Sequence, residues 1–150
     1  EDGIRDRSPS RGLGDVYKRQ VVDSISSTLI HIGHHKKGSD IATGGLYGTE
    51  SAHNVGVIPL GLAMGMRAPI GNKEMVVLVK GKRCQIMAVS LEHITINLDN
   101  VENVAIGDRV TIIGRDGDES LSLQELAYAW QVTPLQALMS ISGRFSVRSI

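Results

Sequence analysis

Residues 76–89 read VVLVKGKRCQIMAV, and this stretch carries the strongest local structural signal in the chain. Two runs rich in strand-forming residues flank a Gly-Lys pair, and Gly81 can adopt the positive φ that a tight hairpin turn needs. The stretch therefore predicts two antiparallel strands, over residues 75–80 and 83–89, joined by a turn at residues 81–82.

Similar short runs occur on both sides of this hairpin. Turn residues separate them, as in Ile106-Gly107-Asp108, and no long helix intervenes. Many short strands at this spacing are typical of a barrel or sandwich rather than of a parallel sheet. The sequence thus predicts a mainly β domain, with further strands over residues 25–32, 55–60, 93–98 and 109–114.

Helix is expected only near the C-terminus. Residues 122–125 (SLQE) form a capping box, in which Ser122 and Glu125 satisfy each other's backbone amides. Apolar residues then recur at three- and four-residue steps. The predicted buried face of this helix consists of Leu123, Leu126, Ala127 and Trp130. A second short helix is expected to start near Pro134, and its predicted buried side consists of Leu135, Leu138 and Met139.

The composition describes one globular domain. The chain has 150 residues, of which 41% are hydrophobic and 21% charged, and 16 Lys and Arg balance 16 Asp and Glu. No apolar run approaches the roughly 20 residues that cross a bilayer, and the neutral charge lacks the basic excess of a nucleic-acid binder. We therefore expect no membrane or nucleic-acid partner. Cys84 is the only cysteine, which fits a reducing compartment and a cytoplasmic protein.

Residues 1–20 differ from the rest of the chain. They read EDGIRDRSPSRGLGDVYKRQ, with nine charged residues and no apolar periodicity. They lack both the apolar core of a secretory signal and the acid-poor composition of a transit peptide. The stretch resembles translated adaptor sequence. We interpret it as an adaptor-derived or disordered leader, with the folded domain over residues 21–150.

The residues alone identify no catalytic site. The segment between residues 33 and 53 is expected to be a loop, because Gly, His and Lys are frequent in it. His34 and His35, like His31 before them, lack Cys or acidic partners at metal-ligand spacing, so a solvated turn is favoured over a metal site. Residues 44–48 (GGLYG) match neither a phosphate-binding loop nor a dinucleotide fingerprint.

Two other groups also have a structural interpretation. Cys84 is predicted to be a small buried residue rather than a nucleophile. Asp116, Asp118 and Glu119 are predicted to form a solvated acidic turn. No Ser/His/Asp constellation follows from the spacing.

The order of segments resembles the C-terminal domain of bacterial alanine racemases, the fold-type III enzymes that use pyridoxal phosphate. The segments that carry the resemblance are, in order, SSTLIHI, LYG, VGVIPLGLAMGM, VLVKGKRCQIMAVSLEHITINL, GDRVTIIG, ESLSLQELA and SISGRFSVR. They cover essentially all of residues 21–150. The resemblance implies a β-barrel-like domain with one or two short helices near the C-terminus, and an N-terminal (β/α)8 barrel that is absent from this chain.

The resemblance also implies a reaction. Racemisation needs a proton acceptor on one face of Cα and a donor on the other, with pyridoxal phosphate as the electron sink. In the family, a Lys of the N-terminal barrel binds the cofactor and serves one face, and the Tyr of a Tyr-Gly motif serves the other. Tyr47-Gly48 matches that motif, so Tyr47 is implied as the base for the L-enantiomer.

Partners and pathway follow from the same resemblance. Family members place this Tyr in the active site of the partner subunit, which implies a homodimer. The implied activity is the interconversion of L- and D-alanine, which supplies D-alanine for peptidoglycan. The present chain alone is expected to be inactive, because the cofactor Lys belongs to the missing domain.

The chain departs from the family pattern at several pocket positions. Leu62 and Met64 stand where the family has the Tyr and Asp of Gly-Tyr-Ala-Asp-Gly, and Leu91-Glu92 replaces Met-Asp. The resemblance implies that Leu91 keeps a backbone contact to the substrate carboxylate and that Glu92 keeps the acidic charge. Gly143 stands where many members have a Tyr near the cofactor phosphate. Because of these departures, the resemblance does not fix which amino acid is the substrate.

Three interpretations remain. The first is the C-terminal part of an amino acid racemase. The second is a racemase-like protein that is non-catalytic, or whose wider and less polar entrance at Leu62 and Met64 admits an amino acid larger than alanine. The third is a stand-alone β-barrel binding module, which is suggested by the GDRVTIIG segment because strands of this type are common in many barrels. Few aromatic residues are available for base stacking, which argues against a nucleic-acid version of the third.

Overall fold

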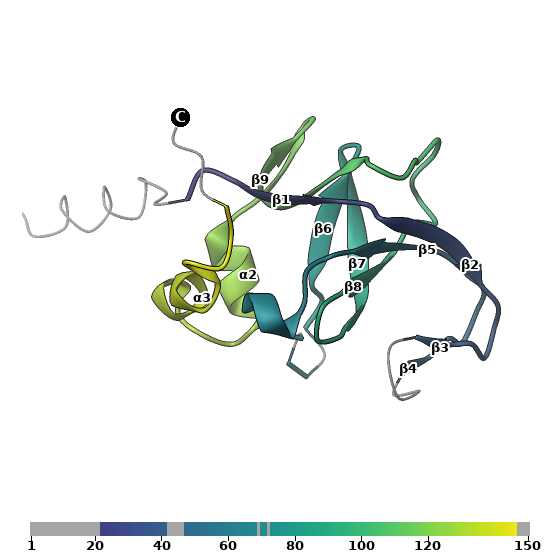
Figure 1. Cartoon of the computed structure of the whole chain (residues 1–150), viewed down its shortest axis with the longest axis horizontal. Helices are drawn as coiled ribbons and strands as arrows, with labels where there is room; N and C mark the ends of the chain where they lie inside the picture. The colour runs from purple at the N-terminus through teal and green to yellow at the C-terminus, as the bar shows by residue number, and fades with distance from the viewer. Residues whose placement is uncertain (1–21, 42–46, 69, 72, 147–150) are drawn as a thin grey trace, which may run out of the picture.

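The computed structural model describes residues 22–41, 47–68, 70–71 and 73–146, without the side chains of residues 41, 47 and 48. The leader predicted at residues 1–20 lies outside these ranges. The described part is mainly β, with two short helices after the strands, as the sequence predicted (Figure 1). Within it, no helix is long and apolar enough to cross a membrane.

The elements follow one another in a simple order. The strands are β1 (Ile25–Thr28), β2 (His31–His35), β3 (Asp40–Ile41), β4 (Tyr47–Gly48), β5 (His53–Ile58), β6 (Val76–Val79), β7 (Lys82–Val89), β8 (Ile94–Asn97), β9 (Arg109–Asp116) and β10 (Glu119–Leu121). A short 3-10 helix, η1 (Leu62–Met64), follows β5. The helices α2 (Leu123–Ala129) and α3 (Pro134–Ile141) come last.

The main sheet has the strand order β1-β9-β6-β7-β8-β5-β2, with β10 added to β9 and with β3 and β4 paired separately. Its two end strands are consecutive in the chain, since only Leu29 and Ile30 separate them. The Leu29 amide donates to the Asp108 carbonyl (2.9 Å), and the Ile30 amide donates to the Val57 carbonyl (2.9 Å). The sheet therefore curls until its ends meet at one chain segment. The result is the barrel-like shape that was predicted, without a closed ladder.

This arrangement corrects the prediction of one strand over residues 25–32. β1 pairs with β9, whereas β2 pairs with β5 at the other end of the sheet. Residues 25–32 contain no turn residue that would separate the two strands, so only the long-range pairing reveals the change of partner at Leu29.

The hairpin of β6 and β7 forms as predicted, with its turn one residue earlier. Val79 pairs with Lys82, so the two turn residues are Lys80 and Gly81. Their φ angles are 49° and 71°. Positive φ at both positions matches the right-handed twist of the flanking strands, which is why two-residue hairpins favour it. Lys82 therefore belongs to β7 rather than to the turn.

Cys84 lies on the inner face of β7, as predicted. It is 1% exposed, and burial raises the pKa of its thiol to about 11. Burial alternates along this strand, with Cys84, Ile86 and Ala88 buried and Arg83 and Gln85 exposed. The same core contains Trp130 from the end of α2, which is 0% exposed.

The capping box at α2 forms as predicted. The Ser122 amide donates to Glu125 Oε2 (2.9 Å), and the Glu125 amide donates to Ser122 Oγ (3.2 Å). Leu126 and Ala127 are buried on the predicted face, with Trp130 directly after the helix.

Helix α3 begins at Pro134, but the prediction of its buried side is wrong. Leu135 and Met139 are each 67% exposed and Leu138 is half-buried, whereas Ala137 and Ile141 are buried. Residues 137 and 141 also follow a four-residue step, and both belong to the core to which α2 contributes Leu126 and Ala127. A second capping box, between Thr133 and Gln136, was not predicted.

The acidic segment is a hairpin rather than a free turn. Glu119 pairs with Asp116, which makes Gly117 and Asp118 the turn between β9 and β10. Gly117 has a φ of 62°. The segment predicted as a loop likewise contains short strands, because β3 and β4 pair within it.

Candidate functional site

Two segments that the resemblance matched separately lie side by side in the structure. The Leu62 amide at the start of η1 donates to the Ser90 carbonyl (3.0 Å), and the Ala63 amide donates to the Leu91 carbonyl (2.9 Å). These two bonds join η1 to the turn between β7 and β8. The side chains of Leu62 and Leu91 remain 49% and 64% exposed.

Gly61 explains how the two backbones approach so closely. A Cβ at this position would lie 2.4 Å from the Leu91 carbonyl oxygen and 2.5 Å from the Ser90 carbonyl oxygen. Its φ of −159° is ordinary extended backbone. Glycine is therefore needed here for space rather than for an unusual conformation.

The end of α3 and the residues after it complete this surface. Ser140 Oγ donates to the Gly65 carbonyl (2.7 Å), and Arg144 Nη1 donates to the Ala63 carbonyl (2.8 Å). We call residues 61–65, 90–92 and 140–144 together the η1 surface. Figure 1 shows the short teal helix η1 beside α2 and α3.

The predicted pocket residues are gathered on the η1 surface. Leu62, Leu91 and Glu92 are exposed there, and Met64 is partly buried against the core. Gly143 is exposed next to Arg144, with a φ of 73° and no atom within 4 Å of the place where a Cβ would stand. The structure thus places on one surface the four positions that the resemblance assigned to substrate and cofactor contacts, namely Leu62, Leu91, Glu92 and Gly143.

Tyr47 lies elsewhere. It belongs to β4, where it pairs with Ile41 of β3, and its side chain lies outside what the structure describes. Figure 1 shows the β3–β4 pair on the side of the barrel away from η1 and the helices. Within one chain, Tyr47 is therefore not brought to the η1 surface.

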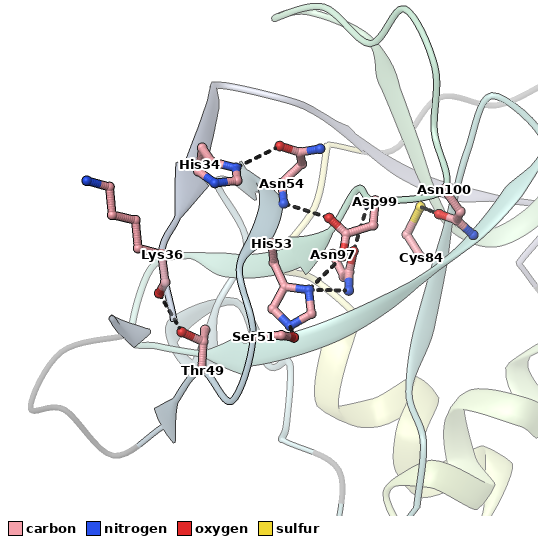
Figure 2. A network of polar contacts seen from close by, with 10 residues as sticks. All are labelled: His34, Lys36, Thr49, Ser51, His53, Asn54, Cys84, Asn97, Asp99 and Asn100. Atoms are coloured by element: carbon pink, nitrogen blue, oxygen red, sulfur yellow. Dashed lines mark hydrogen bonds and ion pairs between the residues drawn. The ribbon is translucent and has the colours of Figure 1, made fainter. Parts of the chain in front are cut away.

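A polar network lies where the chain returns from β4 to the barrel (Figure 2). His53 Nε2 lies 2.9 Å from Ser51 Oγ, and His53 Nδ1 lies 2.6 Å from Asp99 Oδ2. The Asn54 amide donates to the other oxygen of Asp99 (2.7 Å). Partial burial of Asp99 disfavours its charged form, but hydrogen bonds from His53, the Asn54 amide and Asn97 outweigh it, so the pKa of Asp99 is lowered.

The sequence did not reveal this network. Asp99 and His53 are separated by 46 positions, and only the pairing of β5 with β8 brings them together. The histidines of the supposed solvated turn are also placed differently, because His34 and His35 belong to β2. His34 Nδ1 lies 3.0 Å from Asn54 Oδ1. Among the residues described, no three His, Cys, Asp or Glu side chains are grouped so that they could hold a metal ion.

A separate group of ion pairs, centred on Arg83, joins two strands to α2 on the outside of the domain. Arg83 Nε lies 2.8 Å from Glu119 Oε2, and Arg83 Nη1 lies 3.2 Å from Glu125 Oε1. Arg83 Nη2 also donates to the Ser120 carbonyl (3.1 Å). These bonds connect β7 with β10 and with the first turn of α2, so they have a structural role.

The fold is a barrel-like β domain, and the residues matched to the family's pocket positions lie on its exposed η1 surface. The sequence profile of the alanine racemase C-terminal domain matches residues 22–149, and the chain belongs to this family. Alanine racemase 1 of Bacillus subtilis is 30% identical over 145 residues, which are 95% of this chain and 36% of that protein.

Solved structures agree with this assignment. The alanine racemase of E. faecalis superposes with a TM-score of 0.72 at 33% identity, covering 81% of this chain and 32% of that one. The histidine racemase of Leuconostoc mesenteroides superposes with a TM-score of 0.65 at 31% identity, covering 78% and 31%. The chain therefore spans about a third of the length of the relatives it matches.

Proposed function

We propose that this chain is the C-terminal domain of a pyridoxal-phosphate-dependent amino acid racemase, and that Tyr47 acts in the active site of a partner subunit. The domain would follow a (β/α)8 barrel that carries the cofactor Lys. With alanine as substrate, the D-alanine formed in the cytoplasm would serve peptidoglycan synthesis. The observation that carries the proposal is that the matched pocket positions lie together on the η1 surface, while the matched Tyr-Gly motif lies elsewhere. It belongs to the segment between the end of β2 and the start of β5, described over residues 36–41 and 47–52, which we call the arm.

The position of Tyr47 supports a dimer. In one chain, the β3–β4 pair that carries Tyr47 and the helix η1 lie on different sides of the barrel, which fits a site that takes its Tyr from the other subunit. In a symmetric dimer, each subunit can extend this arm into the site of the other. The homodimer is then part of the catalytic arrangement.

Tyr47 would take the proton from Cα of the L-enantiomer. A free Tyr has a pKa of about 10, so positive charge near the phenolic oxygen must favour the phenolate for the base to work near neutrality. When bound, pyridoxal phosphate supplies the electron sink that makes this proton acidic.

Leu91 and Gly143 are suited to backbone contacts. The bond from Leu62 to the Ser90 carbonyl orients the peptide between Ser90 and Leu91. Because the carbonyl and the N–H of a trans peptide point in opposite directions, the Leu91 N–H is directed away from the Leu62 amide, so it could donate to a substrate carboxylate that lies beyond this peptide. At Gly143, the open space beside the backbone would let a phosphate approach without a side chain in the way.

The identity of the substrate is a separate question, and one observation favours an amino acid larger than alanine. Leu62 is apolar and half exposed where alanine racemases have a phenol. A relative that is 31% identical is named a histidine racemase, which shows that this domain also occurs in enzymes for larger amino acids. We therefore propose a substrate larger than alanine as the alternative. Measuring turnover of alanine, serine, lysine and histidine by the two-domain protein decides between them, since activity on alanine alone would remove the alternative.

Replacing Tyr47 by Phe in the two-domain protein tests the role of Tyr47. We expect racemisation from L to D to fall by about 10²- to 10⁴-fold, as on loss of a general base, while cofactor absorbance is retained. Tyr128→Phe is the matched control, because Tyr128 is 66% exposed on α2. Unchanged L-to-D conversion in Tyr47→Phe would refute the role of Tyr47.

A further inference from the structure

We propose that His53 is a positioning residue, which holds the segment carrying Tyr47 against the barrel through Ser51 and Asp99. The proposal rests on the proposed function in one respect, namely that Tyr47 is the residue to be positioned. The network itself lies entirely within the described residues.

The arm that carries Tyr47 leaves the barrel at a single pair of residues. His35 and His53 form the last pair of the ladder between β2 and β5. Beyond this pair, the chain extends through β3 and β4 and returns. The orientation of the arm relative to the barrel thus depends on what fixes the chain close to His35 and His53.

The arm has an internal anchor at Thr49. Its Oγ1 donates to the Lys36 carbonyl (2.8 Å), its amide donates to the Ser39 carbonyl (3.1 Å), and its carbonyl accepts from the Gly38 amide (2.8 Å). Thr49 is only 6% exposed. These bonds hold the two sides of the arm together, but none of them reaches the barrel sheet.

The His53 network makes that connection. Ser51 lies on the arm, two residues after Thr49, and its hydroxyl contacts His53 Nε2 (2.9 Å). His53 Nδ1 contacts Asp99, just after β8, and Asp99 is held in turn by the Asn54 amide. The chain of contacts therefore runs from the arm, through the ring of His53, to two strands of the barrel (Figure 2).

The connection survives a change of protonation. The carboxylate of Asp99 can only accept, so His53 Nδ1 carries a hydrogen, and Nε2 of the neutral ring accepts from the Ser51 hydroxyl. In the protonated ring, Nε2 donates to Ser51 Oγ instead. Asp99 is the acid that contacts the ring, and His35 is its neighbour across the strand pair.

The same three groups, in the same order, occur in Ser-His-Asp catalytic triads. The surroundings favour a positioning role. Ser51 is exposed and the Asp99 side chain is 41% exposed, whereas an acyl-transfer site excludes water and stabilises an oxyanion. A nucleophilic Ser51 would be labelled by a fluorophosphonate probe in a manner that depends on His53.

Hydrogen exchange of the 150-residue chain tests the connection without any catalysis. In His53→Ala and in Ser51→Ala, we expect the Thr49 amide, which donates to the Ser39 carbonyl, to exchange about fivefold faster, the effect of one typical hydrogen bond. His53→Asn, whose amide can still donate to Asp99, should fall between His53→Ala and the parent. The control is His34→Ala, which removes an exposed His of β2 that contacts only the Asn54 side chain in the network.

Kinetics of the two-domain protein test the consequence. Misplacing the arm should lower kcat by about ten- to a hundredfold in His53→Ala, with KM changed less than twofold, and His53→Asn should restore part of the loss. Unchanged exchange in both Ser51→Ala and His53→Ala, or His53-dependent labelling of Ser51, would overturn the proposal. Failure of the proposed function is separate, because it appears as full activity in Tyr47→Phe.

Discussion

Replacing Gly61 by Ala should separate η1 from the turn between β7 and β8. The new Cβ would lie 2.4 Å from the Leu91 carbonyl oxygen and 2.5 Å from that of Ser90. Ordinary contacts begin near 3.4 Å, so one backbone must move by about 1 Å. Overpacking of this kind costs about 1–3 kcal/mol, and we expect the upper end because both opposing atoms are backbone. At about 4 °C per kcal/mol, the midpoint of thermal unfolding should fall by roughly 10 °C.

Two assays check this prediction. Thermal unfolding by circular dichroism gives the midpoint, and hydrogen exchange shows whether the amides of Leu62 and Ala63 lose protection along with their bonds to the turn. Gly33→Ala is the matched control, because its Cβ would first meet the end of the flexible His31 side chain, at 3.0 Å. A Gly61→Ala variant as stable as Gly33→Ala, with Leu62 and Ala63 still protected, would refute the close approach of the two segments.

Three further results are expected. Cys84 should react slowly with iodoacetamide at pH 8 in the folded chain, and rapid alkylation under native conditions would contradict its burial. Because the raised pKa of about 11 favours the thiol in the folded state, the contribution of Cys84 to stability should be lost as the pH rises from about 9 towards 11. In the parent chain, the lowered pKa of Asp99 gives stability that is present above its usual pKa and is lost as the pH falls through the folded value. In Asp99→Asn, the free energy of unfolding should therefore decrease less steeply below about pH 4. An acid-unfolding curve identical to that of the parent would argue against the network. Ser122→Ala should cost about 1 kcal/mol in urea unfolding, and Gln124→Ala, on the exposed side of the same helix, should cost much less.

The sequence predicted the elements whose signals are local. The β6–β7 hairpin depends on Gly81 between two strand-forming runs, and the start of α2 depends on the Ser122–Glu125 box, so neighbouring residues suffice for both. The prediction of the buried side of α3 failed because Leu135, Leu138 and Met139 also follow the three- and four-residue spacing of a buried helix face. Ala137 and Ile141 are buried in the core instead, which only the tertiary packing of the helix decides.

The site depends on long-range contacts. Nothing near His53 in the sequence points to Asp99, and the continuous pattern through residues 25–32 does not show that its two halves pair with opposite ends of the sheet. The pocket residues Leu62, Leu91 and Glu92 were identified by resemblance alone. The structure adds that the chain brings their segments together, through backbone bonds that neither segment indicates by itself.

The most direct test of the central claim is a mixed dimer of the two-domain protein. One subunit carries Tyr47→Phe, and the other carries a substitution of the cofactor Lys in the N-terminal domain, so that each homodimer is inactive. If Tyr47 acts in the partner's site, random mixing makes half of the dimers hybrid, each with one complete site, and about a quarter of the parental activity returns. If Tyr47 acts within its own subunit, or takes no part in catalysis, this gain on mixing will not occur.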